Sequence, residues 1–142
     1  MSHLLCFGLG FSASVLAARL KRQGWAISAT SRSGSGAARI AALGYRGLVF
    51  DGTAPLADTD FDGVTHVVVS APPGDDGDPV LRRHAAVFAR RAGQFRWVAY
   101  LSTTGVYGDH GGGLVTEDTP LTPNTERGAR RDASFRCTTA SS

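Results

Sequence analysis

Residues 4–13 read Leu4-Leu5-Cys6-Phe7-Gly8-Leu9-Gly10-Phe11-Ser12-Ala13, and this stretch decides the fold of the chain. It places an apolar run, typical of a buried strand, directly before a glycine-rich turn and the start of a helix. Gly8 permits the tight turn, Gly10 leaves room for a pyrophosphate beside the backbone, and Ala13 keeps the helix close to the strand. Free N–H groups at the helix start, Phe11 and Ser12, would then face the anion. The stretch predicts a dinucleotide-binding turn; the alternative is a glycine turn that only connects a strand to a helix.

The rest of the chain alternates between strands and helices. A helix over 14–23 ends at Gly24, and further helices are predicted over 37–43 and 79–92, with a flexible loop at 34–36. Further strands are predicted over 25–30, 48–50, 65–70 and 97–101. Because strands that alternate with helices form parallel sheets, the expected fold class is α/β, a Rossmann-like three-layer sandwich with strand order 3-2-1-4-5.

The length of 142 residues fits one domain. We assign residues 1–131 to a nucleotide-binding domain and expect 132–142, which lack an apolar period, to be a disordered or non-native tail. The net charge of +3 comes from dispersed arginines, with Lys21 the single lysine. Arginine pairs such as Arg82-Arg83 are typical of solvated helix faces, and no aromatic residues interleave with them, so a nucleic-acid partner is not expected.

The cysteines, the histidines and the hydropathy of the sequence indicate which kinds of protein it does not encode. Cys6 and Cys137 form neither a metal quartet nor a disulfide framework, which suits a reducing cytoplasm. The four histidines show no metal spacing, so no metal site is predicted, and we interpret them as solvated or capping groups. No apolar run is long enough for a membrane span, and no export signal precedes the first strand. The sequence therefore predicts a soluble cytoplasmic protein.

The end of the second strand indicates which dinucleotide binds. An acidic residue there would bind the 2′-hydroxyl of NAD, but the sequence has Ser31-Arg32-Ser33. A guanidinium flanked by hydroxyls can hold a 2′-phosphate, so NADP is favoured over NAD; the alternative is that Arg32 is an ordinary loop cation. After the third strand, Asp51 either accepts a hydrogen bond from the adenine amino group or starts a turn before Gly52.

The segment after the fifth strand reads Leu101-Ser102-Thr103-Thr104-Gly105-Val106-Tyr107-Gly108-Asp109, with Glu117-Asp118-Thr119-Pro120 and Pro123 beyond it. It resembles the extended short-chain dehydrogenase/reductase family of nucleotide-sugar epimerases and dehydratases, and with the glycine motif the resemblance reaches about Arg131. The resemblance implies that Thr103 orients the substrate and that Ser70, Ala71 and Pro72 border the nicotinamide ribose. It also implies an NAD(P)-dependent oxidoreductase or epimerase/dehydratase acting on a small, sugar-nucleotide-like molecule, with a homo-oligomer as one expected state.

The sequence departs from this family in three places. Arg127 and Arg131 stand where the family has its catalytic Tyr and Lys, and an arginine does not shuttle protons near neutral pH. The glycine spacing also differs from the usual extended pattern, which indicates an atypical branch. The alternative function is therefore a non-catalytic dinucleotide-binding or redox-sensing module.

The third departure is at the end of the chain. Family members continue past the point where this resemblance stops, with further strands and a smaller domain. We therefore expect a truncation or shifted frame, a missing C-terminal part, and an open edge on the strand over 97–101.

Overall fold

A parallel sheet of five strands in the order β3-β2-β1-β4-β5 forms the centre of the molecule. The computed structural model describes residues 1–102, 104–126 and 129–130. The strands are β1 His3–Phe7, β2 Ala26–Ser31, β3 Arg46–Val49, β4 His66–Val69 and β5 Trp97–Tyr100. The predicted fold class and strand order are confirmed.

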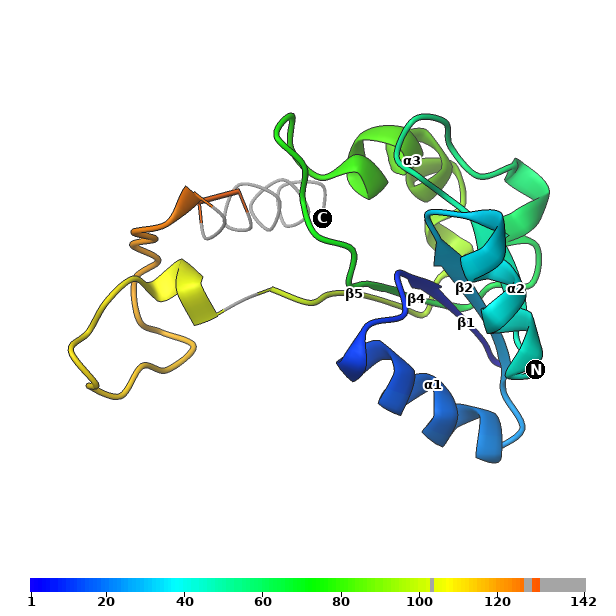
Figure 1. Cartoon of the computed structure of the whole chain (residues 1–142), viewed down its shortest axis with the longest axis horizontal. Coiled ribbons are helices and arrows are strands. Elements are labelled where there is room, and N and C mark those ends of the chain that lie inside the picture. Colours follow the sequence, from blue (N-terminus) through cyan, green and yellow to red (C-terminus); the bar gives the residue numbers. More distant parts are fainter. Residues whose placement is uncertain (103, 127–128, 131–142) are drawn as a thin grey trace.

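Helices cover both faces of this sheet (Figure 1). They are α1 Phe11–Arg22, α2 Gly34–Ala42 and α3 Pro79–Arg90, with short 3-10 helices at η1 Asp58–Phe61, η2 Ala92–Gln94 and η3 Thr104–Tyr107. Leu4 and Cys6 of β1 pack into a core with α1 and α2, whereas Leu5 and Phe7 pack into a second core on the α3 side. Since both faces of β1 are buried over residues 4–7, this part of the strand is continuously apolar rather than alternating.

His84 of α3 is fully buried in the second core. Its Nε2 accepts the backbone N–H of Leu56 at 2.9 Å, so Nδ1 carries the proton and donates to the Val80 carbonyl at 2.9 Å. Burial lowers the pKa of His84. Its ring lies among four aromatic rings, those of Phe7, Phe50, Phe61 and Phe88. The interpretation of His84 as a solvated or capping group is therefore wrong; it is a neutral core residue.

The predicted loop at 34–36 is also wrong, because α2 begins at Gly34. The Ser33 side chain caps the helix by accepting the backbone N–H of Gly36 at 3.1 Å. A Cβ on Gly36 would lie 1.8 Å from the Ser31 Oγ, so glycine lets the first turn of α2 approach the end of β2. The small residues that suggested a loop instead permit close helix–strand packing.

The last strand lies at the edge of the sheet. In the described part of the chain β5 pairs with β4 alone, and Trp97 and Val98 are 44% and 43% exposed. Beyond β5 the segment 104–126, yellow to orange in Figure 1, extends away from the sheet. Two parts of this segment meet at Gly108 (φ +78°), where a Cβ would lie 2.2 Å from the Thr122 carbonyl oxygen, and the Thr122 hydroxyl donates to the Tyr107 carbonyl at 2.8 Å. Within the described ranges, no helix has the length and apolar character needed to cross a membrane.

Candidate functional site

The turn between β1 and α1 is packed tightly against two neighbouring strands. Gly8 has a φ of +85°, and its N–H donates to the Thr30 Oγ1 at 2.9 Å. A Cβ on Gly8 would lie 3.1 Å from the Ser70 Oγ and 3.2 Å from the Ala71 nitrogen. The Ser70 hydroxyl donates to the Gly8 carbonyl at 3.0 Å. Gly8 is thus required for both backbone conformation and space, and Ser70 fastens the turn to the end of β4.

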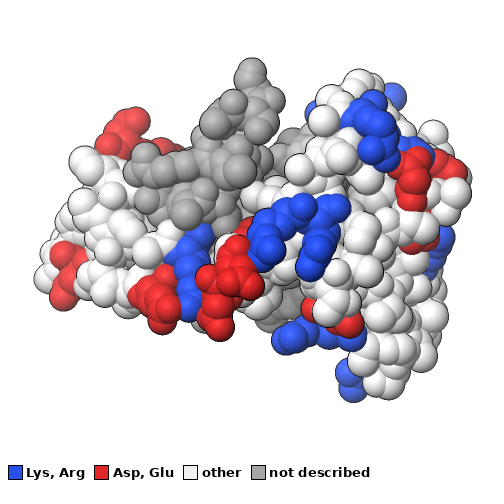
Figure 2. Space-filling model, turned by 90° about the horizontal axis from the view of Figure 1, so that it is seen from above, with Lys and Arg blue, Asp and Glu red and all other residues white. Residues whose placement is uncertain are grey.

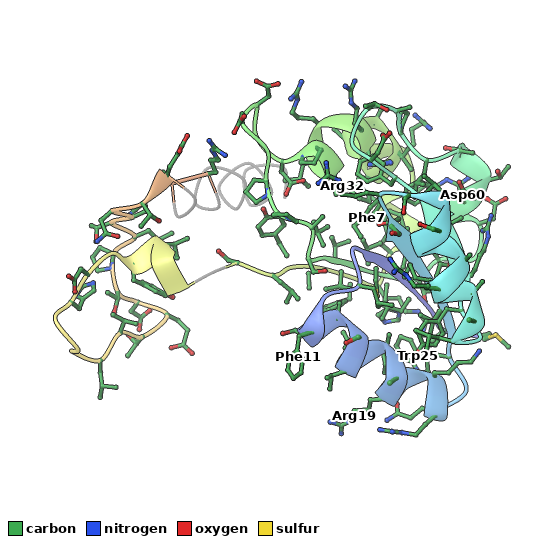
Figure 3. The ribbon with its side chains drawn as sticks, in the orientation of Figure 1. Phe7, Phe11, Arg19, Trp25, Arg32 and Asp60 are labelled. Atoms are coloured by element: carbon green, nitrogen blue, oxygen red, sulfur yellow. The ribbon has the colours of Figure 1, made fainter. Side chains whose placement is uncertain are left out.

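The helix that follows, α1, begins without a side-chain cap. Gly10 stands at the N-cap position and has no side chain, the first turn has no acidic residue, and within the described residues no other side chain caps this end. A Cβ on Gly10 would meet nothing within 4 Å, whereas Ala13 is buried against the sheet side. Phe11 is 86% exposed and projects from α1 away from the sheet (Figure 3). The first N–H groups of α1, including those of the exposed Phe11 and Ser12, are therefore left uncapped by the described side chains, and such N–H groups can bind an anion.

A cavity of about 450 Å³ lies at the carboxyl ends of the strands, and we call it the edge cavity. Four of the predicted binding residues line it together: Arg32, Asp51, Ala71 and Pro72. Arg32 comes from the end of β2 and lies beside the start of α3 (Figure 3). Ligands of open α/β sheets bind at this edge, beyond the carboxyl ends of the strands.

Asp51 forms the turn that one interpretation of the sequence expects. Its Oδ1 accepts the N–H of Thr53 at 2.9 Å and the Thr53 hydroxyl at 2.7 Å. These two hydrogen bonds, with a smaller contribution from the Arg32 guanidinium, lower the pKa of Asp51. The contact with an adenine amino group stays a prediction.

The sequence did not predict the opposite wall of the edge cavity, which comes from α3 and the loop before it. Pro79, Arg82 and Arg83 line this side, and Phe50 adds an apolar surface. The Arg83 Nε donates to the Gly52 carbonyl at 3.1 Å, which joins α3 to the turn after β3. Seen from above, basic and acidic side chains lie side by side across the molecule (Figure 2).

Asp78 is a second feature that the sequence did not predict. It is buried, and its Oδ1 accepts the N–H groups of Val80 at 2.8 Å and Leu81 at 3.1 Å. Its Oδ2 accepts the hydroxyl of Tyr100 at 2.8 Å, so the start of α3 is tied to the end of β5. The signal in the sequence was Asp78-Pro79 directly before the helical period, a typical N-cap followed by proline.

The remaining predicted residues are not brought into this cavity. Ser31 lines a separate depression with Leu9 and Gly36. Thr103, the predicted substrate-orienting residue, lies outside the described residues, as do Arg127, Arg131 and the predicted tail 132–142. Across 1–102, 104–126 and 129–130, no group of three His, Cys, Asp or Glu side chains is placed to hold a metal ion.

Comparison with known proteins identifies structural relatives. No family model matches the sequence, and no curated protein matches it significantly. A functionally unknown conserved protein from Silicibacter pomeroyi has 46% identity and a TM-score of 0.87, with 99% of this chain and 48% of that chain covered. The dTDP-glucose 4,6-dehydratase from Bacillus anthracis, solved in complex with NAD, has 17% identity and a TM-score of 0.74 over 99% of this chain and 50% of that chain.

A short-chain dehydrogenase/reductase superfamily protein from Agrobacterium tumefaciens, solved with bound NAD, has 23% identity and a TM-score of 0.70 over 96% of this chain and 44% of that chain. This chain thus spans about half the length of the chains it matches. The resemblance to short-chain dehydrogenase/reductase proteins is confirmed at the level of the fold.

Proposed function

We propose that this chain is the nucleotide-binding part of an NAD(P)-dependent oxidoreductase or epimerase/dehydratase-like protein. The observation that carries the proposal is the uncapped start of α1, held by the packed turn at Gly8 and open around Gly10. This end lies at the same sheet edge as the edge cavity, so a dinucleotide can reach from one to the other across the switch between β1 and β4.

The residues present fit such a cofactor. The N–H groups of Phe11 and Ser12 would hold the pyrophosphate, and the edge cavity would hold the adenosine. Arg32 in place of an acidic residue supports NADP over NAD. The resemblance implies that Ser70, Ala71 and Pro72 border the nicotinamide ribose. Ser70 lies beside Gly8, whereas Ala71 and Pro72 line the edge cavity, which this proposal gives to the adenosine. When bound, the cofactor supplies a hydride donor or acceptor, and this chain supplies its orientation.

The substrate class and chemistry come from the resemblance. We propose a small, sugar-nucleotide-like substrate, with the Thr103 hydroxyl holding a substrate oxygen and a homo-oligomer as one assembly. The named dehydratase relative supports this class. The buried free thiol of Cys6, whose pKa burial raises to about 12, is compatible with the cytoplasm that we expect from the sequence.

A second candidate is a non-catalytic dinucleotide-binding or redox-sensing module. Arg127 and Arg131 favour it, because they replace the Tyr and Lys on which proton transfer depends in the family that the sequence resembles. Consumption of NADPH with a sugar-nucleotide substrate would support the enzyme, whereas tight binding without turnover would support the module.

Calorimetric titration of the purified chain with NADPH and NADH tests the proposal. Both should bind, NADPH more tightly, and Arg32→Ala should remove the preference. Gly10→Val should abolish binding of both while the chain stays folded, because a Cβ there meets no protein atom within 4 Å. Gly93→Val, at another glycine whose Cβ would meet nothing within 4 Å, is the matched control and should bind normally. Failure of the parent to bind either nucleotide would overturn the proposal.

A further inference from the structure

We infer that Arg83 is a second ligand for the 2′-phosphate of an adenine nucleotide, so that the edge cavity holds this phosphate between the end of β2 and the first turns of α3. The inference rests on the proposed function, because it assigns the adenosine end of the dinucleotide to this cavity. It adds a specificity-determining residue that the strand-end motif does not contain.

The side chain of Arg83 is held in position before any ligand arrives. Gly52, with a φ of +91°, brings the turn after β3 so close to α3 that a Cβ on it would lie 3.3 Å from the Pro79 Cβ. One turn along α3, the Arg83 Nε donates to the Gly52 carbonyl at 3.1 Å. The terminal nitrogens of Arg83 have no protein partner among the described residues, and the side chain is exposed. A guanidinium fixed at Nε and free at its terminal nitrogens is suited to bind a phosphate.

Neighbouring acidic residues do not neutralise this arginine. The guanidinium of Arg82 donates to the Asp76 carbonyl at 3.1 Å and lies 3.8 Å from the Asp76 carboxylate. Asp75 pairs with Arg130, whose Nη1 lies 2.8 Å from its Oδ1. Of the three acidic residues before α3, Asp76 therefore has Arg82 as a partner, Asp75 shares Arg130 with Glu126, and Asp78 caps the helix.

Three charged groups of the cavity lining then remain: Arg32, Arg83 and Asp51. Asp51 is engaged by the N–H and hydroxyl of Thr53. The lining as a whole carries three arginines and three aspartates, so its net charge does not distinguish the ligands; the guanidinium groups of Arg32 and Arg83, which can donate to phosphate oxygens, favour a phosphate over the neutral 2′-hydroxyl of NAD.

The rest of the lining indicates what the phosphate is attached to. Phe50, Ala71 and Pro79 present apolar surface to the same cavity. A volume of about 450 Å³ lies within the usual range for small-molecule sites. Apolar walls beside the guanidinium groups of Arg32 and Arg83 match a purine base and a phosphate on one nucleoside, so the expected ligand chemistry is a 2′-phosphoadenosine.

Fragments of the cofactor that share the 5′-phosphate and differ only in the 2′-phosphate test this. Adenosine 2′,5′-bisphosphate and 5′-AMP are titrated calorimetrically into the parent, Arg83→Gln and Arg83→Lys. Arg83→Gln should weaken the bisphosphate roughly 10- to 100-fold, the range for loss of a charge-assisted hydrogen bond, and leave 5′-AMP unchanged. Arg83→Lys should recover part of the loss, because it restores the charge without the planar fork.

Arg82→Gln is the matched control, since Arg82 precedes Arg83 on the same helix and lines the same cavity but is occupied by Asp76. Its effect on the bisphosphate should be much smaller. If Arg83→Gln leaves bisphosphate binding intact, or weakens the binding of both fragments equally, the inference about Arg83 fails. The proposed function would still stand in that case if the parent binds NADPH and Gly10→Val does not. If no nucleotide or fragment binds the parent, both fail.

Discussion

Two helices, α1 and α3, begin at the same edge of the sheet, and their first turns are built in opposite ways. At α3, Pro79 occupies the start, and the buried Asp78 accepts two backbone N–H groups. At α1, Gly10 caps nothing and the first turn has no acidic residue. The protein satisfies the polar groups at one helix start with its own carboxylate and leaves those of the other exposed.

This difference shows which end can take an anion. A negative ligand at α3 would meet the carboxylate of Asp78, whereas at α1 it would meet N–H groups that no described side chain caps, and the positive end of the helix dipole. The absence of a cap on α1 costs stability, since capping side chains typically contribute about 1 kcal/mol. The comparison thus predicts that exchanging the two designs changes binding and stability in opposite directions.

Gly10→Asp should have the largest effect, because it gives α1 the design of α3. Gly10 has φ −73° and ψ −173°, a conformation open to any residue at a helix start. The new carboxylate would accept first-turn N–H groups, raising the free energy of unfolding by a few tenths of a kcal/mol. It would also occupy the pyrophosphate position, so NADPH and NADH should both bind about 100-fold or more weakly by calorimetry.

Gly10→Asn separates the two causes, because it can cap the helix without adding charge. It should match the stability gain in urea unfolding and lose less affinity than Gly10→Asp. Normal nucleotide binding by Gly10→Asp in a folded chain would show that the start of α1 is not the anion site.

Asp78→Ala should open the start of α3. Two N–H groups lose their acceptor and the Tyr100 hydroxyl loses its hydrogen bond to Asp78, so urea unfolding should show a loss of about 2–3 kcal/mol. Asp78→Asn, which keeps an acceptor oxygen, should lose less. A loss below about 0.5 kcal/mol would mean that this cap does not anchor the helix.

The fold was predictable where local patterns determine it. The apolar run of β1, the glycine turn and the alternation of periods led to the correct strand order. The start of α2 was missed because Gly34 and Gly36 are usual loop residues, and their helical state depends on Ser33 as a cap and on contact with Ser31. Such contacts between elements leave no periodic signal in the sequence.

The site was predictable only in part for the same reason. Gly8, Gly10 and Arg32 stand at positions that the strand–turn–helix pattern marks. Gly8 has a positive φ, a Cβ on Gly10 would meet nothing within 4 Å, and Arg32 lines the edge cavity, while their binding roles stay predictions. Arg83 looked like one of several surface arginines, because its role depends on the turn at Gly52, which is distant in sequence. The Asp78–Tyr100 hydrogen bond likewise joins two elements that only the fold brings together.

The two helices should also differ in their response to pH. Near the sheet α1 packs through Ala13 and Ala17, whereas α3 carries the buried His84. The unfolded imidazole binds a proton near pH 6.5, but burial lowers the pKa of His84 in the fold. Below about pH 6.5 the unfolded state binds more protons, so the free energy of unfolding should fall as the pH drops through the folded pKa.

Urea unfolding of the parent and His84→Gln between pH 7.5 and about 5 checks this. Gln can accept and donate as His84 does, but it lacks the ring that packs among four aromatic rings, so the variant should be less stable at neutral pH. Because Gln does not titrate, the pH profile of the variant should be flatter. Burial also lowers the pKa of His3 and of His66. In His84→Gln these two histidines should still make the free energy of unfolding fall as the pH drops, so part of the slope should remain. An unchanged slope in His84→Gln would exclude His84 as the main source of the pH dependence.

Ser33→Ala should have the smallest effect, because it removes a single hydrogen bond at an exposed cap of a short helix. The Ser33 Oγ accepts the Gly36 N–H at 3.1 Å, and losing this bond should cost about 0.5–1 kcal/mol in urea unfolding. Ser35→Ala is the matched control: its hydroxyl contacts only that of Ser33 among the described residues, so the loss should be smaller. NADH affinity should not change in either variant, since neither touches the turn at Gly10. A Ser33→Ala variant that lost NADH binding would place α2, rather than α1 alone, in the anion site and would weaken the contrast between open and capped helix starts.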